Sequence, residues 1–315
     1  MRAFITGITG FAGSHLYEHL IECGDEVFGC SRNGVWRAGF SPEHAEDATI
    51  LEWDVAQPLA SEVKRYAAEF RPDCIYHLAA MSVPADCGGT EPSAEALAAN
   101  VEGTRAVVDL ALSLEPRPRV LLVSSCYVYS GVTSYDPTVH EESATEPGGG
   151  YGKSKLLAEQ LLLEAAADAG FEGVVARVFQ HTGPRQSPRM IVPEWARQFV
   201  RGANPIEVGS LDTYLDLTDV RDVVRAYRRL MECGESRHIY NVGSGVCLQS
   251  RSIFEKLRAA HDPGRQAKEV APGHRQHPIA DISKISDHTG WKPTIDLDRT
   301  LTDTLAFWQN QEKQD

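Results

Sequence analysis

The sequence predicts an α/β protein built on a doubly wound parallel sheet, with a smaller α/β lobe formed by its C-terminal part. In the first half, short apolar runs alternate with longer segments of helical spacing. A glycine-rich turn follows the first apolar run. After about Arg177 the alternation gives way to shorter elements that are separated by Pro and Gly.

Five short, mostly apolar runs have the character of buried strands, and four longer segments have helical periodicity. The expected strands are Ala3–Ile5, Glu26–Cys30, Thr49–Glu52, Cys74–His77 and Val120–Ser124. The expected helices are Ala12–Cys23, Ser61–Phe70, Ala94–Leu114 and Lys153–Ala169. Strands that alternate with helices imply right-handed crossovers and a parallel sheet covered on both faces.

The domain organisation is predicted from the point, at about Arg177, where the alternation of strands and helices ends. We expect a cofactor-binding domain over residues 1–177 and a lobe over residues 178–315 that mainly binds substrate. Asp219–Asp222 is expected to open a helix that returns to the first lobe, so a later segment of about residues 213–245 rejoins the cofactor-binding domain.

Composition narrows the possible partners. The chain has 315 residues, 42% hydrophobic and 24% charged, as in ordinary globular proteins. Its net charge of −13 would repel nucleic acid and anionic membranes, and no apolar run approaches the ~18 residues of a membrane span. The seven cysteines are scattered without a C-x-x-C pair, which favours reduced thiols and a cytoplasmic location. No carboxylate or cysteine motif joins His15 and His19, so no metal site is expected.

A phosphate-binding loop is predicted where the first strand ends. Gly7, Gly10 and Gly13 have the spacing G-x-x-G-x-x-G and open a helix. Glycines there allow a tight turn and a close approach to a pyrophosphate, whose charge faces the helix N-terminus. The alternative is a turn of no special function. The expected cofactor contacts are Gly7, Thr9, Gly10, Phe11, Ala12 and Gly13.

The end of the second strand predicts which dinucleotide is bound. NAD-binding folds usually carry an acid there for the ribose hydroxyls, but this chain has Ser31 and Arg32, and an arginine can pair with a 2′-phosphate. We therefore predict NADP, with NAD possible; the alternative is that Arg32 is a solvated loop residue. Asp54 and Val55 are expected near the adenine, and Leu78, Ala79 and Ala80 where the cofactor lies close to the backbone.

A catalytic pair is predicted at the start of the last expected helix. Tyr151 and Lys155 are four residues apart and share one helix face. A tyrosine has a pKa near ~10, and a lysine ammonium at ~4 Å is expected to lower it towards working pH for general acid catalysis. Ser125, at the end of the fifth strand, is the expected hydrogen-bond donor to a carbonyl, with Ser124 as runner-up. The alternative is a helix start with surface lysines.

Together these residues resemble the extended short-chain dehydrogenase/reductase class, also called the NAD-dependent epimerase/dehydratase family, whose cofactor domain is a Rossmann fold. Within the class the chain is most similar to the GDP-4-keto-6-deoxy-D-mannose reductase and GDP-mannose 4,6-dehydratase branch. The segments that carry the resemblance are Glu26–Asn33, His77–Ala80, Gly209–Asp212, Asp219–Tyr227, Tyr240–Gly245 and Gly290–Pro293.

The resemblance implies an oxidoreductase that transfers hydride from NADPH to a keto group of a nucleotide-activated sugar. It also implies further cofactor contacts at Ser124, Val178 and His181. The implied substrate contacts are Ser82, Cys126, Tyr127, Gln180, Arg185 and Arg275. Dimers of this class pair two apolar helices, so we expect a homodimer through Ala94–Leu114 and Lys153–Ala169.

Three departures from the family pattern leave the substrate open. Tyr127 stands where the dehydratases, and many of the reductases too, have an acidic residue, so 4,6-dehydration is not expected. Gln180 replaces the usual Asn, and Leu215 stands where an arginine would contact the nucleotide diphosphate. A substrate other than a GDP-sugar, an epimerase with tightly bound NAD(P) and a non-catalytic NADP-binding protein on the same fold remain alternatives.

Overall fold

The central feature of the protein is a seven-stranded parallel sheet. The structure is a computed structural model and describes residues 1–313. The strand order is β11-β7-β5-β4-β1-β2-β3. Its strands are β1 (Arg2–Thr6), β2 (Glu26–Ser31), β3 (Thr49–Glu52), β4 (Cys74–His77), β5 (Arg119–Ser125), β7 (Gly173–Val178) and β11 (Ile239–Val242). The five expected strands are therefore confirmed, with ends that differ by at most one residue.

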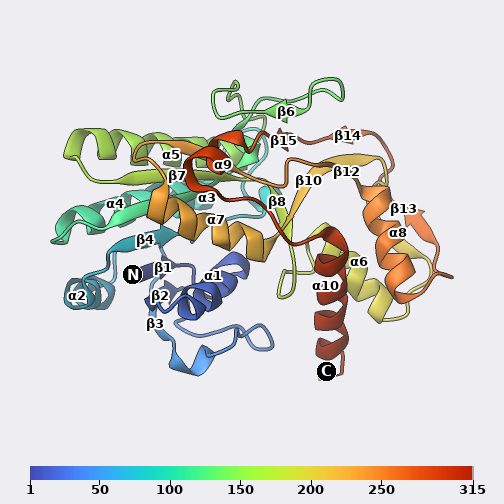
Figure 1. The fold of residues 1–315 in the computed structure, drawn as a ribbon, viewed down its shortest axis with the longest axis horizontal. Helices are drawn as coiled ribbons and strands as arrows, with labels where there is room; N and C mark the ends of the chain where they lie inside the picture. The colour runs from blue at the N-terminus through green and yellow to red at the C-terminus, as the bar shows by residue number, and fades with distance from the viewer. Residues whose placement is uncertain (314–315) are drawn as a thin grey trace.

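Helices cover both faces of this sheet because neighbouring strand residues point to opposite sides. On one face Ile5 and Tyr76 pack under α1 (Phe11–Glu22) and α7 (Val220–Cys233). On the other face Phe4 and Ile75 pack in a second core. The helices of that second face are α2 (Ser61–Phe70), α4 (Gly103–Ser113) and α5 (Gly150–Ala169), and Figure 1 shows the layers.

The strand order places the predicted loops at one point of the sheet. From β1 the chain adds β2 and β3 on one side, and then β4, β5 and β7 on the other. The carboxyl ends of β1 and β4 therefore meet where the order reverses, and open α/β sheets bind their ligands at such a point.

The expected helix Ala94–Leu114 is not continuous. It forms α3 (Ala94–Leu97), a π-helical turn over Ala98–Glu102 and then α4. The π-helical turn contains Asn100, whose buried carboxamide contacts Met81 and Ser154. Apolar periodicity could not reveal this interruption, because it depends on tertiary partners of a polar side chain.

The C-terminal part forms a smaller layer of helices and short strands beside the main sheet (Figure 1). An apolar core that includes Trp195, Phe254 and Leu301 lies among its three helices. These helices are α6 (Ile191–Val200), α8 (Ser250–His261) and α10 (Leu297–Gln311). The strands are β8 (Gln180–Thr182), β9 (Ile206–Val208), β10 (Thr213–Asp219), β12 (Cys247–Gln249), β13 (Ala267–Glu269) and β14 (Arg275–Gln276).

Two later elements return to the first half of the chain. The expected helix at Asp219–Asp222 is α7, which Asp219 caps through the backbone N–H of Arg221 and which packs on α1. β11 then adds to the edge of the main sheet. The domain boundary at residue 177 stays a prediction. The remaining elements are β6 (Thr138–Val139), which pairs with β15 (Ile279–Ala280), and α9 (Ser283–Thr289). Among the described residues, no helix has both the length and the apolar character that crossing a membrane requires.

Candidate active site

The turn after β1 leaves a bare backbone at the start of α1. Gly7 has a φ of 73°, and a Cβ there would lie 2.8 Å from the backbone nitrogen of Ala79. A Cβ on Gly13 would collide with the carbonyl oxygen of Gly7. Gly10 caps α1 without a side-chain hydrogen bond, and the first turn of the helix carries no acid. This cradle fits a pyrophosphate, which backbone N–H groups and the helix N-terminus would bind.

The end of β2 fits the ribose end of a dinucleotide. The Ser31 hydroxyl is buried and has no hydrogen-bond partner within residues 1–313. Arg32 is exposed beside it. A buried hydroxyl without a partner is costly, so a ligand oxygen or phosphate here would satisfy it.

The end of β4 is fixed by a buried hydrogen-bond chain. The Thr104 hydroxyl donates its proton to the Asn100 carbonyl (2.7 Å), so His77 Nε2 must donate to Thr104 (3.1 Å). Burial, together with the charge of Lys155, lowers the pKa of His77 to about 3, so its ring is neutral. Its Nδ1 therefore accepts from the Thr6 hydroxyl (2.7 Å).

This chain joins the phosphate loop to the catalytic helix. Thr6, immediately before Gly7, also accepts from the backbone N–H of Ala79 (3.2 Å). At the other end, the Asn100 carboxamide accepts from Met81 N (2.8 Å) and donates to Ser154 Oγ (2.9 Å), on the turn between the predicted catalytic residues.

Two glycines bring Tyr151 close to the end of β5. A Cβ on Gly152 would collide with the Tyr127 carbonyl, and one on Gly150 would lie 2.5 Å from the Cys87 carbonyl. The start of α5 can therefore pack directly on the segment that follows β4, through Gly150, and on the segment that follows β5, through Gly152. The Tyr151 phenol faces the Ser125 hydroxyl there, and Lys155 Nζ donates to the Val123 carbonyl (2.8 Å).

The expected lowering of the Tyr151 pKa by Lys155 is wrong for this structure. Loss of hydration raises the pKa of Tyr151 well above its ordinary value, although the nearby Ser125 hydroxyl opposes the shift. Burial also lowers the pKa of Lys155 to about 8, while Glu159 opposes this change. The sequence argument counted the lysine charge but had no measure of burial.

The substrate side of Tyr151 is aromatic and polar. The Tyr127 ring lies edge-on to Tyr151, with centroids 5.9 Å apart, and edge-on to His277 at 6.1 Å. Tyr127 is 40% exposed, and burial of its hydroxyl raises its pKa. Both polar atoms of the Gln180 amide are buried and have no partner in the described part of the chain. These groups are therefore available to a ligand.

Other predicted residues have more varied surroundings. His181 stacks on Phe11 at 5.7 Å, beside the phosphate loop. Ser124 donates its hydroxyl proton to Glu159, so of the two serines only Ser125 faces Tyr151. Arg185 is paired with Glu18 on α1, which gives its charge a partner inside the protein.

The other predicted contacts stay predictions. Arg275 is exposed and donates to the Ala271 carbonyl (3.1 Å). Cys126 and Val178 are buried, Ser82 is exposed, and Asp54 accepts from Ala56 N (3.0 Å). Leu215, in the position of the family arginine, packs in the core of the C-terminal lobe.

Sequence reasoning missed the buried polar groups behind the site, His77, Asn100, Glu159 and Arg177. Only Glu159 had a signal, since Tyr151, Lys155 and Glu159 repeat every four residues along one helix face.

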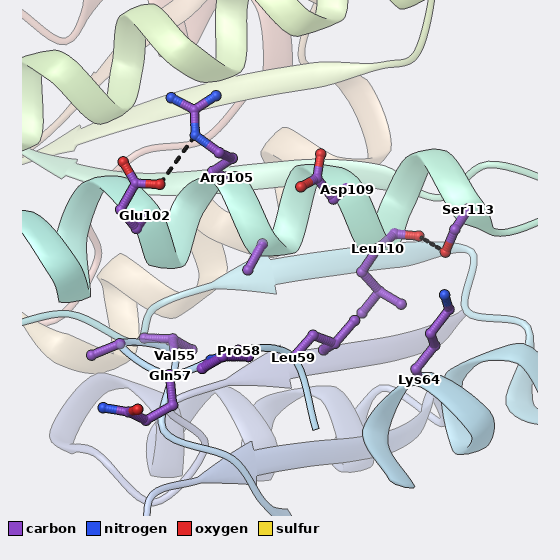
Figure 2. Close-up of a pocket in the computed structure, with 12 residues that line it drawn as sticks. Val55, Gln57, Pro58, Leu59, Lys64, Glu102, Arg105, Asp109, Leu110 and Ser113 are labelled. Atoms are coloured by element: carbon purple, nitrogen blue, oxygen red, sulfur yellow. Dashed lines mark hydrogen bonds and ion pairs between the residues drawn. The ribbon is translucent and has the colours of Figure 1, made fainter. Parts of the chain in front are cut away.

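A cavity of about 460 Å³ lies elsewhere, between α4 and the segment after β3 (Figure 2). Val55 lines it together with residues such as Lys64, Arg105 and Asp109, but Ser125, Tyr151 and Lys155 do not. Two of the charged residues that line it, Glu102 and Arg105, are paired with each other.

Comparison with known proteins gives one family. Residues 3–243 match the profile of the NAD dependent epimerase/dehydratase family. The chain is 31% identical to the GDP-6-deoxy-D-mannose reductase of Pseudomonas aeruginosa, over 100% of this chain and 99% of that protein. It is 26% identical to the UDP-glucose 4-epimerase of Mycolicibacterium smegmatis, over 99% of this chain and 100% of that protein.

Solved structures agree with this relationship. The structure of RMD from Pseudomonas aeruginosa complexed with NADPH superimposes with a TM-score of 0.81 at 28% identity, covering 98% of this chain and 99% of that chain. The structure of a putative epimerase from Burkholderia cenocepacia gives a TM-score of 0.86 at 29% identity, covering 98% of each chain.

Proposed function

The chain belongs to the NAD-dependent epimerase/dehydratase family, and on that premise we propose that it is an NADP(H)-dependent reductase acting on a keto group of a nucleotide-activated 4-keto-6-deoxy sugar. The observation that carries the choice of reaction is the set of side chains around Tyr151. Within residues 1–313 the groups that act on the Tyr151 phenol are Ser125, Tyr127, Cys126 and Cys87, none of them a carboxylate. Gln180 and His277 lie beyond them, next to Tyr127. Reduction of a ketone needs a hydrogen-bond donor and an acid, whereas dehydration also needs a base that removes a proton from carbon.

The bare loop at Gly7 and the buried Ser31 hydroxyl support a dinucleotide, and Arg32 supports NADP. When it is bound, the nicotinamide cofactor supplies the hydride. Ser125 donates a hydrogen bond to the substrate carbonyl, and Tyr151 transfers its proton to the same oxygen as the reduced alcohol forms. Lys155 holds the nicotinamide ribose and stabilises the phenolate that remains.

In this proposal the diphosphate of the nucleotide is bound by other residues than in the family pattern. Leu215 cannot contact a diphosphate from the lobe core. The exposed Arg275 and the unpartnered Gln180 amide are the groups we propose for the diphosphate and the sugar hydroxyls.

An epimerase is the second candidate, favoured by the 26% identity to a UDP-glucose 4-epimerase. An epimerase oxidises and re-reduces one carbon with no net use of cofactor, whereas a reductase consumes one NADPH for each product. The test is a panel of nucleotide-sugars and their 4-keto-6-deoxy derivatives, screened with NADP for a rise in Tm and then for loss of NADPH absorbance. Isomerised sugar at constant NADPH would establish the epimerase instead.

We also propose a homodimer in a reducing cytoplasm. Leu97 on α3 and Leu157 on α5 are exposed large apolar side chains, and α4 and α5 pack side by side, which supports a four-helix contact around a two-fold axis. The cysteines are free thiols, which supports a reducing compartment. Light scattering should give about twice 34.6 kDa, and Leu157→Glu should convert the dimer to a monomer. A monomeric wild-type protein at micromolar concentration would contradict the dimer.

A further inference from the structure

Behind the catalytic pair, α5 carries a third polar residue on the same face. Tyr151, Lys155 and Glu159 are each four residues apart. Glu159 is only 1% exposed, although it lies in a helix whose outer face is open to solvent. A carboxylate this deeply buried is costly unless it is paired and fully hydrogen-bonded.

Its partners come from two strands of the main sheet. Arg177 on β7 reaches Glu159 through Nε (3.1 and 3.2 Å to the two oxygens) and Nη2 (2.8 Å). Ser124 on β5 donates its hydroxyl proton to Oε1. The carboxylate therefore connects the catalytic helix to the strand end that carries Ser125.

Arg177 is held in turn. Its Nη1 donates to the Glu141 carbonyl (3.0 Å), and its guanidinium lies over the Tyr129 ring at 4.8 Å. The Tyr129 hydroxyl donates to the Asn241 carboxamide oxygen (2.6 Å), while the Glu141 carboxylate accepts from Asn241 N (2.8 Å).

Within residues 1–313, one carboxylate is among the groups that act on Lys155. From its own helix Glu159 acts on it, from β4 the neutral His77 faces it, and from the segment after β4 the Cys87 thiol does. Towards β5 its ammonium donates to the Val123 carbonyl, which is an uncharged acceptor. Without Glu159, the buried ammonium would have no opposite charge among these neighbours.

We propose that Glu159, braced by Arg177, is a positioning residue that keeps Lys155 in its ammonium form and fixes the Ser124–Ser125 end of β5 against the catalytic helix. The catalytic part of this proposal rests on the reductase function proposed above. The electrostatic part concerns the protein alone and can be tested without a substrate.

The first experiment titrates Lys155 directly. Protein labelled with ¹³C-lysine is followed by NMR from pH 6 to 10, and the Lys155 signal is assigned by its absence in Lys155→Arg. The wild-type midpoint is expected near a pKa of about 8. Because the carboxylate favours the charged amine, Glu159→Gln should lower this midpoint by about one pH unit.

The matched control is Asp25→Asn. Asp25 is a buried carboxylate that pairs with Arg228 and the N-terminus, at the opposite end of the strands. This variant should lose stability but leave the Lys155 midpoint unchanged. If both variants lower the midpoint equally, it follows global stability and the proposal is overturned.

Glu159→Gln leaves Arg177 buried without its partner, and this variant could fail to fold for that reason. A second variant therefore tests the same proposal. Replacing both residues by Met removes both charges, and such replacements of buried ion pairs are often tolerated. This double variant should also show a lowered midpoint, but by less than Glu159→Gln, because the unpaired charge of Arg177 is gone as well. An unchanged midpoint in a folded form of either variant overturns the proposal, whatever reaction the protein catalyses.

If the reductase function holds, the same shift should appear in turnover. The alkaline fall of kcat should move to lower pH by about one unit in Glu159→Gln, on top of any loss at lower pH from the released end of β5. A loss of kcat with no shift of the alkaline limb would indicate a structural role alone and would overturn the catalytic part.

Discussion

The buried polar groups between the phosphate loop and the catalytic helix are paired with one another, whereas those on the substrate side are not. On the cofactor side, Thr6, His77, Thr104 and Asn100 form an unbroken buried chain. On the substrate side, the Gln180 amide is buried without a partner and Tyr127 is partly exposed. A site that repeats the same hydride chemistry benefits from fixed atoms, whereas recognition of a ligand needs unsatisfied groups that the ligand can pair.

The largest expected effect lies on the catalytic helix. Tyr151→Phe should lower kcat by at least ~100-fold because it removes the acid, and it should barely change NADPH affinity because the ring remains. Steady-state kinetics and fluorescence titration of NADPH measure the two quantities. Tyr127→Phe, the matched control on the substrate side, should retain kcat within ~10-fold. Near-full turnover by Tyr151→Phe would refute the assigned role.

The second prediction concerns how the stability of the folded protein depends on pH where α1 meets the segment after β8. His15 on α1 hydrogen-bonds the Pro184 carbonyl, and burial together with the charge of Arg185 lowers its pKa to about 4. In the unfolded chain His15 takes up a proton below pH ~6.5, whereas in the folded protein it stays neutral down to about pH 4. The free energy of unfolding is therefore undiminished by this residue above pH ~6.5 and falls as the pH drops towards 4. Urea unfolding of the wild type should therefore lose about 2 kcal/mol between pH 7 and pH 5 through this residue. His15→Gln should remove that part of the loss, and an identical pH slope in the variant would contradict the assignment.

The third prediction tests cofactor choice. Arg32→Ala should weaken NADPH binding by about tenfold through loss of a charge-assisted phosphate contact, and it should leave NADH binding unchanged. Dissociation constants for both cofactors measure this difference. Equal weakening for NADPH and NADH would place Arg32 away from the 2′-phosphate.

The smallest effect separates function from stability in the buried chain. Thr104→Val and Thr304→Val each remove a buried hydroxyl that donates to the carbonyl four residues earlier, at 2.7 and 2.8 Å. Thr304→Val should cost about 1 kcal/mol in unfolding free energy, and Thr104→Val about 1 kcal/mol more, because it also leaves the buried His77 Nε2–H without an acceptor. Only Thr104→Val should also lower kcat, by a few-fold, because Asn100 contacts Ser154 on the catalytic helix. Equal kcat values in the two variants would show that the chain serves stability alone.

The sequence was sufficient for the features that depend on local pattern. Apolar runs located the strands, the glycine spacing located the bare turn at Gly7, and the four-residue spacing placed Tyr151 and Lys155 on one helix face. These features are predictable because backbone conformation and side-chain direction repeat with a fixed period.

The tertiary structure decided the features that depend on burial and on partners distant in the chain. It directed the Ser124 hydroxyl to Glu159 and left the Ser125 hydroxyl beside Tyr151. It turned Asn100 inward at a π-helical turn, and it paired Arg185 with Glu18. It also reversed the expected pKa shift of Tyr151. A sequence specifies which groups can ionise or hydrogen-bond, but their hydration and their partners exist only once the strands and helices have packed, and these determine the energy of each group.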